Sequence, residues 1–152
     1  MTARRAALQV TLTTVVFAVL DFLWLGVFMN GFYKAELGPL ARLAGDSFAP
    51  VWWAAFGVYA VLVLGLVVFV LPRANGRPAR AFGFGALLGV VSYGTYDLTA
   101  YSVIAGWSLP MTVVDMLWGA VICGVSSALV TWLEPRLAGA RSPYPAARQR
   151  LV

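Results

Sequence analysis

The stretch VVFAVLDFLWLGVF, residues 15–28, decides the fold of this chain, because it is apolar throughout except for Asp21. Two other stretches share this composition: VVSYGTYDLTAYSV (90–103) contains Asp97, and MTVVDMLWGAVI (111–122) contains Asp115. No Lys, Arg or His lies inside any of the three. A carboxylate at the centre of a bilayer costs about 2.5–3.5 kcal/mol, so such acids normally face a bundle interior or a wet cavity. The three aspartates are therefore the first candidates for a functional site.

The composition of the whole chain indicates an integral membrane protein. Of its 152 residues, 61% are hydrophobic and only 11% are charged, whereas soluble domains carry roughly 25% charged residues. A membrane-crossing helix needs about 20 mostly apolar residues. Four runs are long enough, at about 8–29, 51–71, 81–104 and 109–133. They predict an all-α bundle of four transmembrane helices over residues 1–133, followed by a mobile basic cytoplasmic tail over 134–152.

The basic residues predict the orientation of the bundle. The net charge of +5 does not indicate nucleic-acid binding, because the basic residues are concentrated in particular loops and at the termini. Cytoplasmic loops carry an excess of Lys and Arg, so the termini and the second loop are expected inside, giving an N-in, C-in protein of the inner membrane. The first loop holds Lys34 and Arg42, and the other basic residues are Arg4, Arg5, Arg73, Arg77, Arg80, Arg136, Arg141, Arg148 and Arg150.

The first loop, residues 31–50, mixes apolar and charged residues. This mixture is typical of a short helix that lies in the membrane interface, with Phe32 and Tyr33 at headgroup depth.

Small residues recur at four-residue spacing in the third and fourth helices. Such spacing lets membrane helices approach closely. We expect internal packing of these helices, with a homodimer face as the alternative. The residues are Gly85 and Gly89 in the third helix, and Gly119, Cys123 and Ser127 in the fourth.

The sequence contains few of the residues that usually bind a cofactor or a metal. Cys123 is the only cysteine and there is no histidine, which rules out an internal disulfide and disfavours haem and His-ligated metals. We therefore expect no cofactor and no resident metal, and we interpret Cys123 as a small apolar residue of the fourth helix.

The predicted topology gives the three aspartates a common depth. At 1.5 Å per residue each lies roughly 10 Å below the external surface. A short repeat joins two of them: Asp21-Phe-Leu-Trp24 and Asp115-Met-Leu-Trp118 both read D-x-L-W. If the first and fourth helices pack antiparallel, Asp21 faces Trp118 and Asp115 faces Trp24. Each carboxylate would then accept a hydrogen bond from the other motif's indole, since Trp is a donor only.

The third helix supplies further polar groups at this level. Tyr93 and Asp97 are four residues apart and share a helix face, and Tyr96 and Thr99 flank them. Hydroxyl donors are what a desolvated carboxylate needs, and Tyr59 is the contribution of the second helix. The predicted ligand-binding residues are Asp21, Asp97, Asp115, Trp24, Trp118, Tyr93, Tyr96 and Thr99.

Three interpretations of these residues stay open. Carboxylates a few ångströms apart cannot all ionise in a low dielectric, so at least one should be protonated unless a cation binds. The acids could be structural and fix helix register. They could form an outward-facing site that binds or passes a proton, a hard metal ion or a small cationic or polar ligand. They could also do acid–base chemistry on a lipid, as a membrane enzyme or its accessory subunit, although no nucleophile–base pair is evident.

The runs ALDFLWLGV and FYKAELG, the segment SYGTYDLTAYSVIAGWSLP and the run VDMLWGAV resemble a family of small bacterial four-helix membrane proteins, domain of unknown function 2177. The resemblance covers residues 8 to 133 and is most specific at Tyr93–Thr99 and Gly106–Leu109. It implies the fold and the membrane location but no activity. One departure stands out, because family members often have an Asn where this chain has Ala100.

Overall fold

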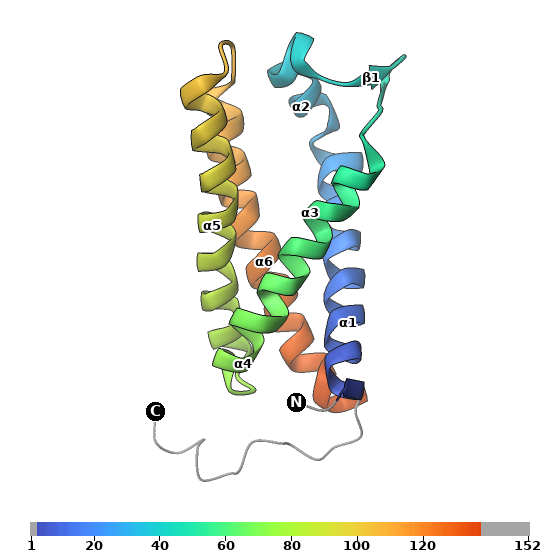
Figure 1. The fold of residues 1–152 in the computed structure, drawn as a ribbon, viewed down its shortest axis with the longest axis vertical. Helices are drawn as coiled ribbons and strands as arrows, with labels where there is room; N and C mark the ends of the chain where they lie inside the picture. The colour runs from blue at the N-terminus through green and yellow to red at the C-terminus, as the bar shows by residue number, and fades with distance from the viewer. Residues whose placement is uncertain (1–2, 138–152) are drawn as a thin grey trace.

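The computed structural model describes residues 3–137, which form four long helical rods joined by short connections (Figure 1). The all-α architecture predicted from the sequence is confirmed. The first rod consists of α1 (Ala3–Asp21) and the π-helical η1 (Phe22–Phe28). The second consists of α3 (Trp52–Gly65), the π-helical η3 (Leu66–Val70) and α4 (Leu71–Ala74). The third rod is α5 (Pro78–Val103), and the fourth is α6 (Leu109–Leu137).

The rods alternate in direction, so the connections gather at two ends (Figure 1). The hairpin of α5 and α6 makes the most extensive helix contact in the bundle, and α1 packs antiparallel against α6. The second rod crosses the others obliquely and joins α5 through a turn in which Asn75 and Gly76 adopt positive φ of 51° and 74°.

Glycine allows α5 and α6 to lie this close. A Cβ on Gly89 would overlap the carbonyl group of Gly119, and one on Gly85 would meet the backbone of Cys123 and the hydroxyl of Ser127. Small residues at this spacing bring helix backbones together. The prediction of internal packing by these residues is therefore confirmed.

The connection after the first rod forms a small cap at one end of the bundle. It contains the predicted short helix, α2 (Asn30–Leu37), followed by the 3₁₀ turn η2 (Gly38–Leu40). Beyond them, β1 (Leu43–Ala44) and β2 (Ser47–Phe48) form a minimal antiparallel hairpin that the sequence analysis did not predict.

Two helix boundaries differ from the predicted ones. The first helix begins at Ala3 rather than near residue 8, and α6 continues to Leu137, past the predicted end at residue 133. Glu134 and Arg5 pair across the end of the bundle, and this ion pair joins the extended end of α6 to the extended start of α1. The predicted tail, from residue 138 on, lies outside the described residues.

Within residues 3–137, three segments are long and apolar enough to cross a membrane: Ala3–Phe28, Trp52–Ala74 and Leu109–Leu137. The helix α5 has 26 residues, but its glycines, tyrosines and aspartate make it less apolar than the other three. Much of the bundle surface consists of exposed large hydrophobic side chains, such as Trp53 and Val103. Apolar surface of this extent is typical of a protein that contacts lipid.

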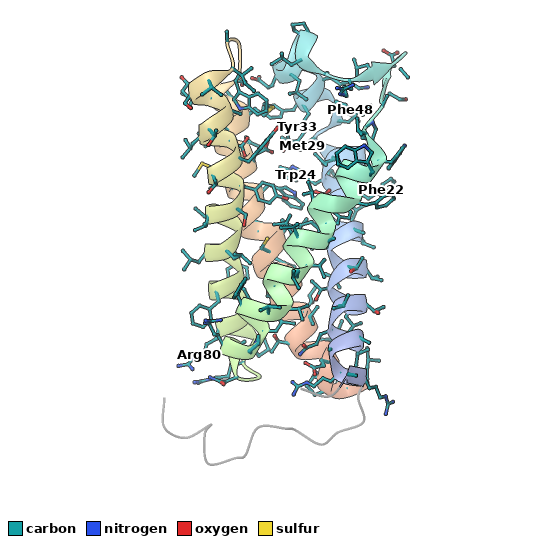
Figure 2. All side chains as sticks on the ribbon, in the orientation of Figure 1. Phe22, Trp24, Met29, Tyr33, Phe48 and Arg80 are labelled. Atoms are coloured by element: carbon teal, nitrogen blue, oxygen red, sulfur yellow. The ribbon has the colours of Figure 1, made fainter. Side chains whose placement is uncertain are left out.

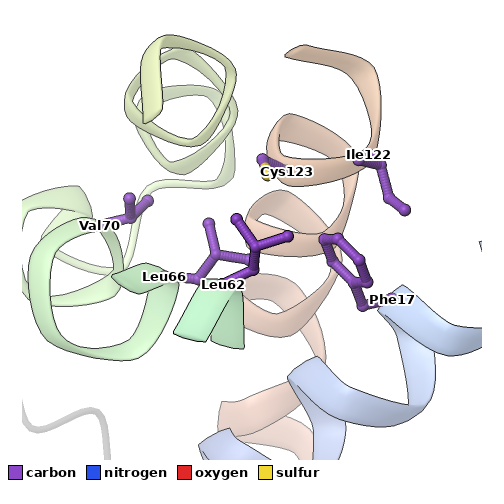
Figure 3. Close-up of a cluster of buried hydrophobic side chains, with 6 residues drawn as sticks. All are labelled: Phe17, Leu62, Leu66, Val70, Ile122 and Cys123. Carbon is purple, nitrogen blue, oxygen red and sulfur yellow. The ribbon is translucent and has the colours of Figure 1, made fainter. Parts of the chain in front are cut away.

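The centre of the bundle is filled by a tightly packed apolar cluster, shown in Figure 3. It joins α1, the second rod and α6 midway along their length. Cys123 is fully buried in it as a small apolar residue, which confirms its interpretation from the sequence. We call this group the apolar plug, and its residues are Phe17, Leu62, Leu66, Val70, Ile122 and Cys123.

Candidate functional site

Asp21 is the last residue of α1 and is buried in the half of the bundle nearer the cap. Its carboxylate accepts two hydrogen bonds: the hydroxyl of Tyr59 donates to Oδ2 at 2.6 Å, and the indole Nε1 of Trp118 donates to Oδ1 at 3.3 Å. The predicted pairing of Asp21 with Trp118 is thus confirmed. Two donors from two other helices satisfy part of this carboxylate, as buried polar groups require.

The second predicted pairing, between Trp24 and Asp115, is wrong. The indole Nε1 of Trp24 donates to the hydroxyl of Tyr33 at 3.1 Å, and that hydroxyl in turn donates to Asp115. The reason lies in η1, because a π-helix bonds residue i to i+5 and so changes the register in which Trp24 follows Asp21. The ring of Trp24 then stacks on that of Trp118, with centroids 4.3 Å apart.

Tyr33, which was expected at headgroup depth, is buried inside the protein. Only 6% of its surface is exposed, because α2 folds back over the end of the bundle. Figure 2 shows Trp24 and Tyr33 near each other in the upper half of the molecule, with Arg80 at the opposite end. Burial, and then the hydrogen bond to Asp115, raise the pKa of Tyr33 above its ordinary value. The phenol therefore stays protonated and remains a donor at neutral pH.

Asp97 is the least satisfied polar group of this region. It is fully buried, and neither carboxyl oxygen receives a hydrogen bond from a donor group among residues 3–137. Its carboxyl group lies within hydrogen-bonding reach of that of Asp115. Since an ionised carboxylate only accepts, a bond between the two needs one proton on the pair. Asp97 and Asp115 are therefore two neighbouring buried carboxyl groups, and such neighbours cannot both ionise without cost in a low dielectric.

The remaining predicted residues divide into two groups. The ring of Tyr93 packs against Gly119 and borders the apolar plug, close to the aspartates. Tyr96, by contrast, is 62% exposed and packs edge-on against Trp107, and Thr99 is exposed. Tyr96 and Thr99 therefore lie on the exposed side of α5, whereas Asp97 lies on its buried side. We define the carboxylate cluster accordingly as Asp21, Asp97 and Asp115 with Trp24, Trp118, Tyr33, Tyr59 and Tyr93.

Sequence reasoning missed the role of Tyr33 and gave Tyr59 only a minor one. Tyr59 lies on the second helix at the depth predicted for the aspartates, and this depth was the sequence signal that it could bind one of them. Within the described part of the chain, no group of three His, Cys, Asp or Glu side chains is arranged to hold a metal ion.

A bundle of long apolar helices with buried carboxyl groups defines a helical integral membrane protein. The family of predicted membrane proteins known as DUF2177 matches residues 6–132, and the chain belongs to this family. This confirms the resemblance found in the sequence. No curated protein and no solved structure matches the chain.

Proposed function

We propose that this protein is a multi-pass protein of the bacterial inner membrane whose carboxylate cluster binds a proton or a small cationic ligand and allows its coupled passage. The observation that carries the proposal is Asp97, which is fully buried without a donor and lies beside Asp115. A purely structural acid would be satisfied by its neighbours, as Asp21 is by Tyr59 and Trp118.

Energetics favour a binding role for this pair. A buried charge is tolerated only when it is paired and hydrogen-bonded, and acids retained within membrane helices mark ion or proton pathways. A proton shared by Asp97 and Asp115 removes one charge and supplies the missing hydrogen bond. An ammonium group would do the same, which is why the ligand class is cationic.

The proposal treats α5 as a fourth membrane span. Its 26 residues correspond to about 39 Å at 1.5 Å per residue, longer than the hydrocarbon core of about 30 Å. It also packs along α6, which is itself apolar enough to span. The cytoplasmic placement of the termini draws support from the basic residues, because Arg5, Arg73, Arg80 and Arg136 belong to the element ends opposite the cap.

Infrared spectroscopy of the purified protein in lipid tests the proposal directly. A protonated carboxyl group absorbs apart from a carboxylate, so the wild type should show a protonated band at neutral pH. Asp97→Asn should remove it, and so should Asp115→Asn, because the proton belongs to the pair. Adding ethylammonium should reduce the wild-type band if the site accepts amines.

The matched control is Asp46→Asn, because Asp46 is an exposed aspartate in the cap, outside the cluster. It should leave the band unchanged. A wild-type spectrum identical to those of both Asp97→Asn and Asp115→Asn would mean that neither carboxyl group holds a proton, and the proposal would fall.

A further inference from the structure

A second buried polar cluster lies at the opposite end of the bundle, between α1 and α6. Glu134 accepts hydrogen bonds from Arg5 and, through Oε2, from Nε2 of Gln9 at 2.9 Å. Glu134 and Gln9 are 7% and 3% exposed, so the carboxylate and the amide are both withdrawn from the surface. The arginine makes an ion pair with Glu134 from the first turn of α1. This group, which we call the inner cluster, is not used by the proposed function.

Some buried oxygens of α1 and α6, one of them in the inner cluster, have no hydrogen-bond partner among the described residues. The amide oxygen of Gln9, the hydroxyl of Thr131 and the hydroxyl of Ser126 are buried and find no hydrogen-bond partner among the described residues. Thr131 is 7% exposed and Ser126 is fully buried. Buried polar oxygens are normally satisfied by protein or by ordered water, which bonds to two to four polar groups. These oxygens thus suit an ordered water molecule.

The two clusters are arranged along the same pair of helices. The buried residues of α1 are Gln9, Thr13, Phe17 and Asp21, which are four residues apart and share one face. Gln9 and Asp21 are separated by about 18 Å of helix rise. Because α6 runs in the opposite direction, Asp115 lies near its start at the cap end, and Glu134 lies near its finish at the other end. The same helix interface therefore carries an acid at both of its ends.

The apolar plug lies between the two clusters (Figure 3). Phe17 and Ile122 face each other across the α1–α6 interface, and the ring of Phe17 meets that of Tyr59 edge-on at 5.5 Å. Tyr59 donates to Asp21, so the plug contacts the carboxylate cluster directly. Its residues Leu66 and Val70 belong to the π-helical η3, and π-helical turns occur frequently at functional sites.

We infer that Glu134 and Gln9 form the inner proton-binding station of a pathway whose outer station is the carboxylate cluster, and that Phe17 and Ile122 are the barrier between them. This inference rests on the proposed function. A proton leaves the Asp97–Asp115 pair, is carried by water past the opened plug, and is accepted by the carboxylate of Glu134, which releases it on the side of Arg5. No covalent bond other than those to the proton is made or broken.

Proton flux into liposomes tests this inference. The full chain is reconstituted with a pH-sensitive dye inside and a potassium diffusion potential as driving force. Glu134→Gln keeps one acceptor oxygen in place of the two that Arg5 and Gln9 use, and its amide does not take up a proton at neutral pH. It should lower the flux severalfold or more, because the amide cannot take up the proton that the Glu134 carboxylate would accept. Glu134→Asp should restore part of the flux, which a merely structural ion pair would not require.

Phe17→Ala tests the barrier, and it should raise the flux severalfold above the wild type. Combining it with Glu134→Gln should return the flux to the low level. Two controls are matched in chemistry: Glu36→Gln changes a glutamate in the cap, and Phe22→Ala changes a phenylalanine that is 68% exposed. Both should behave as the wild type.

Two outcomes would overturn the inference. One is a Glu134→Gln protein that folds and carries wild-type flux. The other is a Phe17→Ala protein with no flux above that of protein-free liposomes. Either result leaves the infrared test of Asp97 and Asp115 unaffected, so failure of the inner station can be told from failure of the outer site.

Discussion

The indole rings of Trp24 and Trp118 lie face to face, with centroids 4.3 Å apart and planes only 4° from parallel. They come from the two D-x-L-W motifs, so stacking joins the first and last rods of the bundle. Trp118 directs its N–H group to Asp21, while Trp24 directs its own to Tyr33. The two stacked indoles therefore belong to different hydrogen-bond networks: Trp118 to that of Asp21, and Trp24, through Tyr33, to that of Asp115.

Trp118→Phe should destabilise the protein modestly, because it keeps an aromatic ring but removes the donor to Asp21. Hydrogen bonds between membrane helices average about 0.6 kcal/mol and reach about 1.7 kcal/mol. Unfolding of single and double variants in detergent should show that Trp118→Phe has little further effect once Asp21 is Asn. Fully additive effects would contradict the hydrogen bond.

Tyr33→Phe should destabilise by about 1–3 kcal/mol, the usual cost of leaving a buried polar group without its partner. The affected groups are Asp115, which accepts from the Tyr33 hydroxyl, and Trp24, whose indole donates to it. Its effect should shrink in an Asp115→Asn background but not in an Asp21→Asn background. Tyr101→Phe is a suitable control, since Tyr101 is exposed on α5, and it should leave the unfolding transition unchanged.

Gly89→Ala should disrupt the α5–α6 contact, because the added Cβ would overlap the backbone of Gly119. Overpacking costs typically 1–3 kcal/mol, and more where backbones must separate. Gly83→Ala is the matched control on the same helix, since its Cβ would meet nothing within 4 Å. The thermal transition of the first variant should fall well below that of the second; equal transitions would contradict the close packing.

Asp97→Asn should stabilise the fold, and the gain should grow as the pH rises. Under the proposed proton sharing, the native pair holds a proton that the unfolded chain loses, so the stability of the wild type should fall with increasing pH. An Asn side chain donates to Asp115 without titrating, and a hydrogen bond to a charged group is worth about 1.5–3 kcal/mol. Thermal unfolding across neutral to mildly alkaline pH measures this difference. A variant less stable than the wild type over the whole range would contradict it.

A reporter fused after Val152 should be active in the cytoplasm, because the Arg-rich ends of α1, α4 and α6 lie on one side of the bundle and basic residues favour the cytoplasmic face. The complementary fusion is an insertion at Gly45 of the cap, which should report the periplasm. Periplasmic activity of the C-terminal fusion would reverse the topology and the assignment of inner and outer clusters.

Much of this architecture followed from local sequence. Long apolar runs predict helices because the backbone must satisfy its own hydrogen bonds in lipid. The glycines of α5 and the small residues of α6 predicted a close helix pair, since spacing alone sets which residues share a face. The D-x-L-W repeat correctly brought Asp21 to Trp118. These inferences needed only helix periodicity and the cost of burying polar groups.

The partners of the other acids depended on contacts between distant parts of the chain. The π-helical turn of η1 altered the register of Trp24, and no local sequence pattern predicted this turn. Tyr33 reached Asp115 only because α2 folds back over the bundle, and Gln9 met Glu134 only because α1 and α6 pack antiparallel. Periodicity fixes the face on which a side chain lies, but the donor opposite it is set by how the helices cross. The sequence by itself thus determined the helices and the buried aspartates, and the tertiary structure decided which groups satisfy them and that Asp97 is left with Asp115.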